Sequence, residues 1–305
     1  MARKPKLIGK EPGECKQSKP IILIYGDAKT GKTMFSLDFP MVYYIDTEGG
    51  ASRSHYQEVL AKNGGAYVGP DQGSNSFDVV IGQVEALATT DHPYKTLVID
   101  SYSKLFNTDV SCELQRFVDQ GKYHGGESTF GAEKKNAIRL TTRLIRWFQK
   151  MDMNVILVCH EKEKWRKQEV VGVTYDGWDK LKYELDLSFR TTVSGKKHMA
   201  EVVHTRLNGG GMSFPKGASF PLSFDEFAKR YGKDIIERSR EEVLALASDE
   251  QIDRLNVLID LTKTPVETQS KWKSKAAVDN WGQMDSVTIG KCINALEKKL
   301  EVAKQ

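Results

Sequence analysis

The fold is most constrained by one stretch of eight residues, Gly26-Asp27-Ala28-Lys29-Thr30-Gly31-Lys32-Thr33. Its spacing, G-x-x-x-x-G-K-T, is that of a phosphate-binding loop. An apolar β-type run over 21–25 leads into it, and residues 34–37 continue as the start of a helix. A strand, a glycine loop and a helix N-terminus direct backbone N–H groups at an anion. A glycine turn before an ordinary helix is the alternative, but the strand and helix in register favour a phosphate site in an α/β fold, with contacts from Gly26 to Met34.

Two further apolar runs end in acidic residues. Residues 41–46 end in Asp46 and are followed by Thr47-Glu48-Gly49-Gly50, and residues 94–100 end in Asp100. Ligands of open α/β sheets bind at the carboxyl ends of strands, so these acids are expected near the phosphate loop. Lys32 would then neutralise the β- and γ-phosphates, while Thr33 and Asp100 would hold Mg²⁺.

The candidate for the water-activating base is Glu48. Many ATPases carry that glutamate directly after the metal-binding Asp, but here Ser101 follows Asp100. Glu48 is the best-placed remaining carboxylate, and its alternative role is to cap a helix. A third apolar run, 154–160, ends in His160, where a γ-phosphate sensor would lie; a purely structural hydrogen bond is the alternative for this histidine.

The segment 161–183 mixes basic residues with tryptophan. Basic side chains interleaved with indoles suit single-stranded nucleic acid, because cations meet phosphates and indoles stack on bases. The alternative is that tryptophan anchors this loop on the body of the protein. Residues 107–130 are rich in Gly, Asp, Lys and Ser and are predicted to form a long loop or a broken helix. The candidate DNA-binding residues are Lys162, Lys164, Trp165, Arg166, Lys167 and Lys122.

A length of 305 residues predicts one large domain and a smaller one. We expect a flexible basic arm over 1–19, an ATPase-like core over 20–240 and a helical accessory domain over 241–305. We expect a mostly parallel central sheet in this core, and strand-like runs around the turn at 194–197 predict an antiparallel extension of it. Lys196, Lys197 and Arg206 are candidates for reaching the nucleotide of a neighbouring subunit, although a solvated hairpin explains the two lysines equally well.

Composition excludes several classes. The net charge of +4 permits nucleic-acid binding without indicating it. No run approaches the ~20 apolar residues of a membrane span, and the basic N-terminus has no apolar core after it, so neither a span nor a signal peptide is expected. The four cysteines lie far apart without a CxxC pair, which argues against zinc and a disulfide framework and favours a cytoplasmic location.

Four motifs taken together, GDAKTGKT, YYIDTEGG, TLVIDSYSKL and NVILVCHEK, resemble the core of RecA recombinases over roughly residues 20–206. The resemblance implies ATP and Mg²⁺ as ligands, with Glu48 as base, Asp100 as metal ligand and His160 as sensor. It also places the DNA-binding loops at 107–130 and 161–183. RecA itself carries Gln where His160 stands, and the long N-terminal oligomerisation domain of recombinases has no counterpart in this sequence, so a ring is an alternative to a filament.

The H-E-K ending and the helical tail are more similar to the compact RecA-like ATPases of bacteriophages, which act in recombination and single-strand annealing. This implies an ATP-dependent, single-stranded-DNA-binding ATPase in the host cytoplasm, assembled as a ring or filament. A single-strand-binding protein or another recombination protein is the expected partner of the C-terminal helices. The alternatives are a hexameric helicase or loader motor, a DNA-independent nucleotide switch, and a phosphotransferase.

Overall fold

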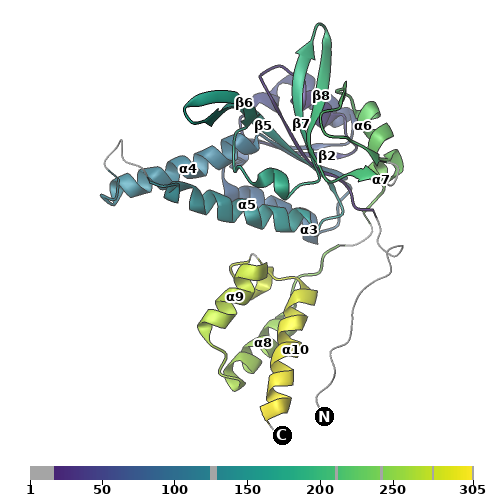
Figure 1. Cartoon of the computed structure of the whole chain (residues 1–305). Coiled ribbons are helices and arrows are strands. Elements are labelled where there is room, and N and C mark those ends of the chain that lie inside the picture. The colour runs from purple at the N-terminus through teal and green to yellow at the C-terminus, as the bar shows by residue number, and fades with distance from the viewer. Residues whose placement is uncertain (1–16, 124–128, 210–211, 241–242, 277, 304–305) are drawn as a thin grey trace.

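A nine-stranded sheet forms the centre of the computed structural model, which describes residues 17–123, 129–209, 212–240, 243–276 and 278–303 (Figure 1). The strand order is β11-β8-β7-β1-β5-β4-β2-β3, and β6 pairs with β5. The strands of this sheet are β1 (Ile21–Gly26), β2 (Val42–Asp46), β3 (Ala66–Val68), β4 (Thr96–Asp100), β5 (Asn154–Arg166), β6 (Glu169–Tyr175), β7 (Leu187–Ser194), β8 (Lys197–Thr205) and β11 (Ser219–Pro221). A separate short pair consists of β9 (Asn208–Gly209) and β10 (Met212–Ser213).

The sheet is mostly parallel, as predicted. The strands β3, β2, β4, β5, β1 and β7 run in one direction. The strands β8 and β11 extend the sheet antiparallel beyond β7, and β6 folds back on β5. The predicted α/β class with an antiparallel extension is therefore confirmed.

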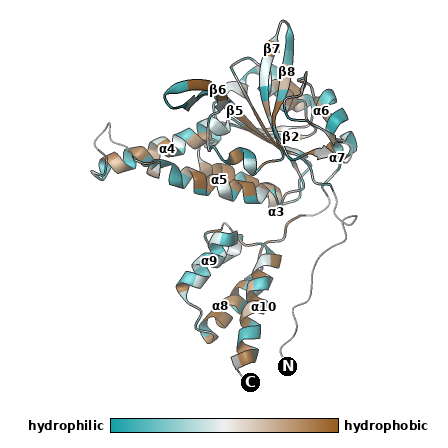
Figure 2. Cartoon of the chain, viewed as in Figure 1, coloured by the Kyte–Doolittle hydropathy of each residue, from teal (hydrophilic) through white to brown (hydrophobic). Residues whose placement is uncertain are grey.

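Helices cover both faces of the sheet. They are α1 (Lys32–Leu37), α2 (Ser54–Lys62), α3 (Phe77–Thr89), α4 (Tyr102–Asp119), α5 (Lys135–Phe148), α6 (Phe224–Tyr231) and α7 (Lys233–Glu237). One apolar core lies beneath α3, α4 and α5, and a second lies beneath α1, α2, α6 and α7. Alternate residues of β1 serve the two cores: Leu23 enters the first and Ile24 the second, as a period of two requires. Both faces of β1 are buried, which is why it reads as an unbroken apolar run. Figure 2 shows hydrophobic residues, in brown, along strands at the centre of the sheet.

The segment predicted as a long loop or a broken helix over 107–130 begins as a regular helix. The 18-residue α4 covers its first part, and only its first turns are buried, at Tyr102, Ser103, Leu105 and Phe106. The rest of α4 extends past the sheet with polar residues in solvent, so its composition resembles that of a loop. It ends in a Schellman motif, in which Gly121 N–H donates to Val118 O and Lys122 N–H to Phe117 O. Residues 124–128 of the expected loop lie outside the described residues.

The segment 161–183 is also more regular than predicted. β5 continues to Arg166, well beyond the end of its parallel neighbours, and turns at Lys167 and Gln168 into β6. We call residues 161–175 the basic hairpin. The sequence of this hairpin is rich in charged residues and did not indicate a strand. A half-buried strand is identified by alternating apolar residues, and that alternation requires a core beneath the strand.

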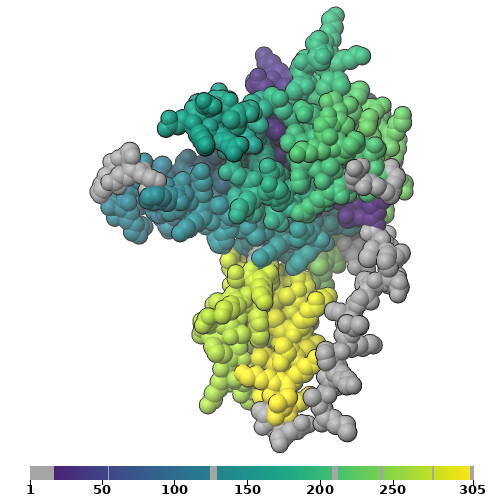
Figure 3. All heavy atoms as spheres, in the orientation of Figure 1, coloured from purple at the N-terminus to yellow at the C-terminus, as the bar shows by residue number. Residues whose placement is uncertain are grey.

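Three C-terminal helices, α8 (Asp249–Leu261), α9 (Val266–Ala276) and α10 (Ser286–Ala303), pack around an apolar core of their own. Ser248 and Gln251 form the capping box that the sequence predicts at the start of α8. Figure 3 shows these helices as a lobe that lies against the α/β body.

Most of the expected N-terminal arm, residues 1–16, lies outside the described residues. Lys19, at its end, is buried, and its ammonium donates a hydrogen bond to Arg238 O at 2.6 Å. Burial lowers the pKa of Lys19 to about 8. Among the described residues, none of the helices has both the length and the apolar character that crossing a membrane requires.

Candidate nucleotide-binding site

The phosphate loop connects β1 to α1 and leaves no room for a side chain at its first glycine. A Cβ on Gly26 would lie 2.3 Å from Thr191 Oγ1 and 2.5 Å from Thr191 O, on the neighbouring strand β7. Gly31 has φ of 92°, in the left-handed region that favours glycine. Thr191 also exchanges a hydrogen bond with Thr30 at 2.6 Å. β7 therefore braces the loop from one side.

Lys32 lies across the mouth of the loop. Its ammonium donates hydrogen bonds to Gly26 O at 2.9 Å and Asp27 O at 2.7 Å. Burial lowers the pKa of Lys32, while the Asp100 carboxylate opposes that effect. Its third partner is the Thr30 hydroxyl, at 3.4 Å. A half-buried ammonium whose partners are neutral loop oxygens is well suited to receive a phosphate oxygen.

Thr33 and Asp100 meet at the carboxyl end of the sheet. Thr33 Oγ1 donates to Asp100 Oδ2 at 2.7 Å, and the Tyr44 hydroxyl donates to the same oxygen. Burial raises the pKa of Asp100, and these two hydrogen bonds oppose the rise. A hydroxyl beside a carboxylate supplies the hard oxygen ligands that Mg²⁺ prefers, so the pair fits that metal.

The Asp46 carboxylate binds backbone N–H groups rather than a ligand. Its carboxylate accepts hydrogen bonds from the N–H groups of Glu48, Gly49 and Ala51, at 2.8 to 2.9 Å, and from the Tyr67 hydroxyl at 3.0 Å. These contacts shape the turn after β2. The shape of this turn determines where the side chain of Glu48 projects.

Glu48 and His160 form an ion pair at the mouth of the site. Glu48 Oε1 lies 2.8 Å from His160 Nε2 and also accepts a hydrogen bond from Ser101. The bond with His160 lowers the pKa of Glu48 and raises the pKa of His160. Both bonds end on Oε1, so Oε2 has no hydrogen-bond partner among the described residues.

The order of the strands explains why His160 reaches this place. β5 lies between β1 and β4, with His160 in register with Gly26 and Val158 in register with Asp100. Its side chain therefore emerges between the phosphate loop and the candidate metal ligand. A cavity of about 380 Å³ joins these groups; it is lined by Gly26, Asp27, Ala28, Lys29, Lys32, Thr33, Glu48, Asp100, His160 and Glu161.

The candidate DNA-binding residues occupy different environments. Lys164, Trp165, Arg166 and Lys167 are exposed on the basic hairpin. Lys162 is instead close to the body of the protein, with its ammonium 3.2 Å from Asp176 Oδ1. Lys122 is exposed beyond the C-terminal end of α4, and that helix places it roughly 25 Å from the end of the sheet.

Two of the three candidate trans-acting cations lie at one end of β8, and the third lies at the other end. Lys196 and Lys197 are exposed at the turn between β7 and β8, which projects past the phosphate loop (Figure 1). Arg206 lies at the opposite end of β8, where its N–H donates to Asp186 O. These residues cannot serve the same point on a neighbour.

Sequence reasoning missed several residues that shape the site. Tyr44 and Thr191 come from β2 and β7, and nothing near the phosphate loop indicates them. Ser101 follows Asp100 directly and could have been found as the polar residue closest to the metal ligand. Arg190 on β7 pairs with Glu161 at 2.8 Å, beside the cavity, and this pairing depends on which strands become neighbours.

A family model described as an AAA domain matches residues 18–212. The chain belongs to the AAA domain family. The match places it among the P-loop NTPases and includes Lys32, Glu48, Asp100 and His160. The AAA domain also includes the basic hairpin, whereas the three C-terminal helices lie outside the matched residues.

Two solved structures are similar to part of this chain. The crystal structure of the RadB recombinase has 18% identity and a TM-score of 0.42, covering 67% of this chain and 87% of that chain. The crystal structure of the flagellar accessory protein FlaH from Methanocaldococcus jannaschii has 16% identity and a TM-score of 0.38, with the same coverage of 67% and 87%. No curated protein matches the chain. Both TM-scores lie below 0.5, so the family match and the site geometry carry the assignment.

Proposed function

We propose that this protein binds ATP with Mg²⁺, hydrolyses the ATP, and couples hydrolysis to single-stranded DNA, as a recombinase or single-strand-annealing ATPase. One observation carries the proposal: β5 runs without interruption from His160 in the nucleotide cavity to the exposed basic hairpin. The nucleotide site and the basic surface are therefore parts of one strand.

Each residue of the nucleotide site would have its own role in hydrolysis. Lys32 would bind the β- and γ-phosphates, and Thr33 and Asp100 would hold Mg²⁺, which supplies charge neutralisation when bound. Glu48 would orient the attacking water through Oε2, since Oε1 already accepts hydrogen bonds from His160 and Ser101. Its lowered pKa keeps Glu48 ionised at neutral pH, so that its carboxylate can accept a hydrogen bond from the water.

His160 would connect nucleotide state to DNA. A γ-phosphate is a second acceptor close to His160 Nε2 and would compete with Glu48 for its hydrogen bond. A change in that hydrogen bond would act on β5 at the point where the strand leaves its parallel neighbours. The ATP-bound state would then present the basic hairpin differently from the ADP-bound state.

The hairpin suits single-stranded DNA by charge and by exposure. Lys164, Arg166 and Lys167 form no ion pair with the described residues, so their charges are available to phosphates. Trp165 is 60% exposed and covers no core, which makes its ring available for stacking on a base.

The test is ATP hydrolysis with and without single-stranded DNA, at low and high salt, for the wild type and Lys164→Gln/Lys167→Gln. We expect stimulation that fades with salt, and a variant that keeps basal hydrolysis but loses stimulation. Lys229→Gln/Lys298→Gln, at exposed lysines on α6 and α10, is the matched control because it removes the same charge. Hydrolysis indifferent to DNA would contradict the proposal and favour a nucleotide switch. Phosphate on a small acceptor would favour a phosphotransferase, and ATP-driven strand separation a helicase or loader motor.

We also propose a homo-oligomer in which Lys196 and Lys197 act on the nucleotide of a neighbour. The hairpin that carries them extends beyond its own phosphate loop into solvent. A mixture of Lys196→Gln/Lys197→Gln protein with Lys32→Ala protein should regain hydrolysis that neither has alone, because each supplies what the other lacks. Additive, uncomplemented activity would place both lysines outside catalysis.

A further inference from the structure

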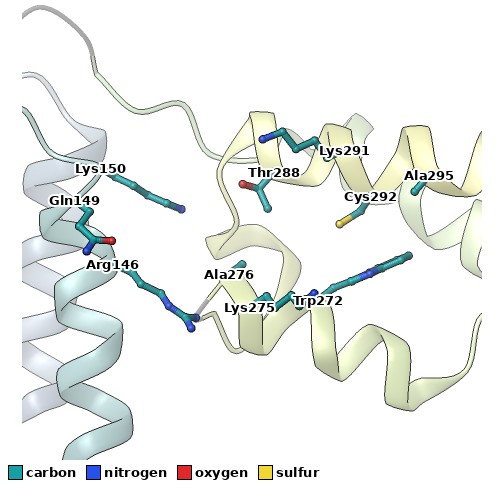
Figure 4. Close-up of a pocket in the computed structure, with 10 residues that line it drawn as sticks. All are labelled: Arg146, Gln149, Lys150, Trp272, Lys275, Ala276, Thr288, Lys291, Cys292 and Ala295. Carbon is teal, nitrogen blue, oxygen red and sulfur yellow. The ribbon is translucent and has the colours of Figure 1, made fainter. Parts of the chain in front are cut away.

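A basic cavity lies between the α/β body and the C-terminal helices. It has a volume of about 520 Å³ and lies between α5 on one side and α9 and α10 on the other (Figure 4). We call it the interdomain cleft. Its cations are Arg146 from α5, Lys150 just after the end of that helix, Lys275 from α9 and Lys291 from α10. No carboxylate belongs to its lining, and it shares no residue with the nucleotide cavity.

Two of these cations hold the two parts of the protein together. Lys150 lies 2.6 Å from Asp285 Oδ2, and Arg146 donates a hydrogen bond to Ser274 O. Lys275 and Lys291 differ, because neither has a hydrogen bond or an ion pair with any residue that the structure describes. Two like charges that face one cavity without a counter-charge create a positive potential that attracts an anion.

The cleft continues along α5. A second cavity of about 470 Å³ shares Arg146 with the first and adds Arg139, Arg143 and Lys273. Asp279 is the carboxylate in its lining, and it pairs with Arg143 at 2.6 Å and with Arg139 at 3.8 Å. The spacing of the α5 cations, four, three and four residues apart, puts them on one face of the helix. The basic surface is therefore a trough rather than a single pocket.

An aromatic ring completes the cleft. Trp272 packs partly against the core of the C-terminal helices and partly lines the cavity. Figure 4 shows Arg146 and Lys150 extending from α5 towards the helices that carry Trp272 and Lys291. Cations beside an accessible indole suit a ligand with both phosphates and exposed bases. A simple inorganic anion would use only the cations.

We propose that the interdomain cleft is a second site for single-stranded nucleic acid, with phosphates on Lys275 and Lys291 and a base on Trp272. The inference deepens the proposed function, on which it rests for the class of ligand. The cleft and the basic hairpin are separate surfaces, so one molecule could hold two strands, as annealing requires.

The test uses the full chain and a fluorescein-labelled oligothymidylate, with binding followed by anisotropy over a range of salt. Lys275→Gln/Lys291→Gln is compared with Lys229→Gln/Lys298→Gln, a control with the same charge change on exposed lysines elsewhere. We expect affinity about tenfold lower in the cleft variant and a salt slope smaller by about 1.4, at ~0.7 per lost phosphate contact. The melting temperature should not fall, because neither lysine has a contact within the described structure to lose.

The hairpin variant Lys164→Gln/Lys167→Gln separates the two proposals. Loss of binding in the hairpin variant alone would overturn the cleft and leave the proposed function standing. Loss in the cleft variant alone would support the cleft and overturn the hairpin as the DNA site. Unchanged binding in both variants would overturn both. Equal weakening with a duplex of the same length would overturn the assignment to single strands, since a duplex hides the faces of its bases.

Discussion

At the scale of single residues, the nucleotide site depends on the different roles of the two carboxylate oxygens of Glu48. Glu48 uses one oxygen for His160 and Ser101 and keeps the other without a partner among the described residues. The first oxygen fixes the side chain, and the second is available to water. Asp46 has the opposite arrangement, because both of its oxygens are engaged by the turn that presents Glu48.

Replacement of Glu48 by Gln should lower the turnover number by about 10²–10⁴-fold, the usual worth of a positioned base. Nucleotide affinity should remain within a few-fold of wild type, because Lys32, Thr33 and Asp100 are unchanged. The measurement is single-turnover hydrolysis together with equilibrium binding of a fluorescent ATP analogue. Turnover retained in Glu48→Gln would remove this residue from the mechanism.

His160 should titrate above its ordinary value near 6.5, because Glu48 stabilises the imidazolium. NMR titration should show this raised pKa, and Glu48→Gln should lower it. The pair contributes fully between the unfolded pKa of Glu48 and that of His160. Its contribution is lost as pH rises through the raised pKa of His160 or falls through the lowered pKa of Glu48. Solvent screens these half-exposed groups, so His160→Gln should change the stability below pH 6 by less than about 1 kcal/mol. An unshifted pKa in wild type would contradict the pair.

Much of the site was predictable because its residues follow local patterns. Lys32 and Thr33 belong to a contiguous motif, and Asp100 and His160 end apolar runs that become adjacent parallel strands. Tyr44 and Thr191 could not be predicted, because their contacts depend on which strands become neighbours. Thr191 lies 161 positions from Thr30 in the chain, yet the pairing of β7 with β1 puts their hydroxyls in contact.

At the scale of elements, the basic hairpin shows why a strand can be mistaken for a loop. Its turn residues, Lys167 and Gln168, have φ of 49° and 66°, although neither is a residue type that announces a turn. α4 shows the converse problem: a helix that extends past the sheet has no need of apolar residues along most of its length. In both elements the sequence lacks a clear apolar pattern, because the segment does not cover a core.

Gln168→Gly should stabilise the turn of the basic hairpin by about 0.5–1 kcal/mol, because glycine adopts positive φ without steric cost. Amide hydrogen exchange across β5 and β6 beyond His160 should slow accordingly. Gln168→Val is the opposite control, since a β-branched residue is strained at this φ and should speed exchange. Faster exchange in Gln168→Gly than in wild type would contradict the observed turn.

At the scale of the whole molecule, a few polar contacts join the C-terminal helices to the α/β body. Asp285 is the most buried of them: it accepts a hydrogen bond from Lys150 and caps the start of α10 through Thr288. Burial alone would raise the pKa of Asp285, but the bonds from Lys150 and Thr288 outweigh it, and the pKa lies below its ordinary value.

Asp285→Asn should lower the free energy of unfolding at pH 7 by about 1–3 kcal/mol, the typical worth of hydrogen bonds to a charged group. A depressed carboxyl pKa stabilises the fold above the unfolded value and loses that contribution as pH falls through the folded value. The difference from wild type should therefore shrink below pH 4 in denaturant titrations. Asp279→Asn, whose side chain is 63% exposed, should cost less than about 1 kcal/mol. Equal effects of the two changes would show that burial does not govern this contact.

The uninterrupted course of β5 has a mechanical consequence. Within the sheet, β1 and β4 pair with the strand on both sides. Beyond His160 its backbone pairs with β6, while Glu161 and Lys162 contact Arg190 and Asp176. The strand reaches about 17 Å from His160 to Trp165, at the usual rise of a strand. Its pairing with β6 shifts register between Lys164 and Trp165, where a bulge bends a strand. A rotation of β5 at the nucleotide site would therefore move the hairpin up to Lys164 as one piece, and the bulge would set how much of that movement reaches the tryptophan.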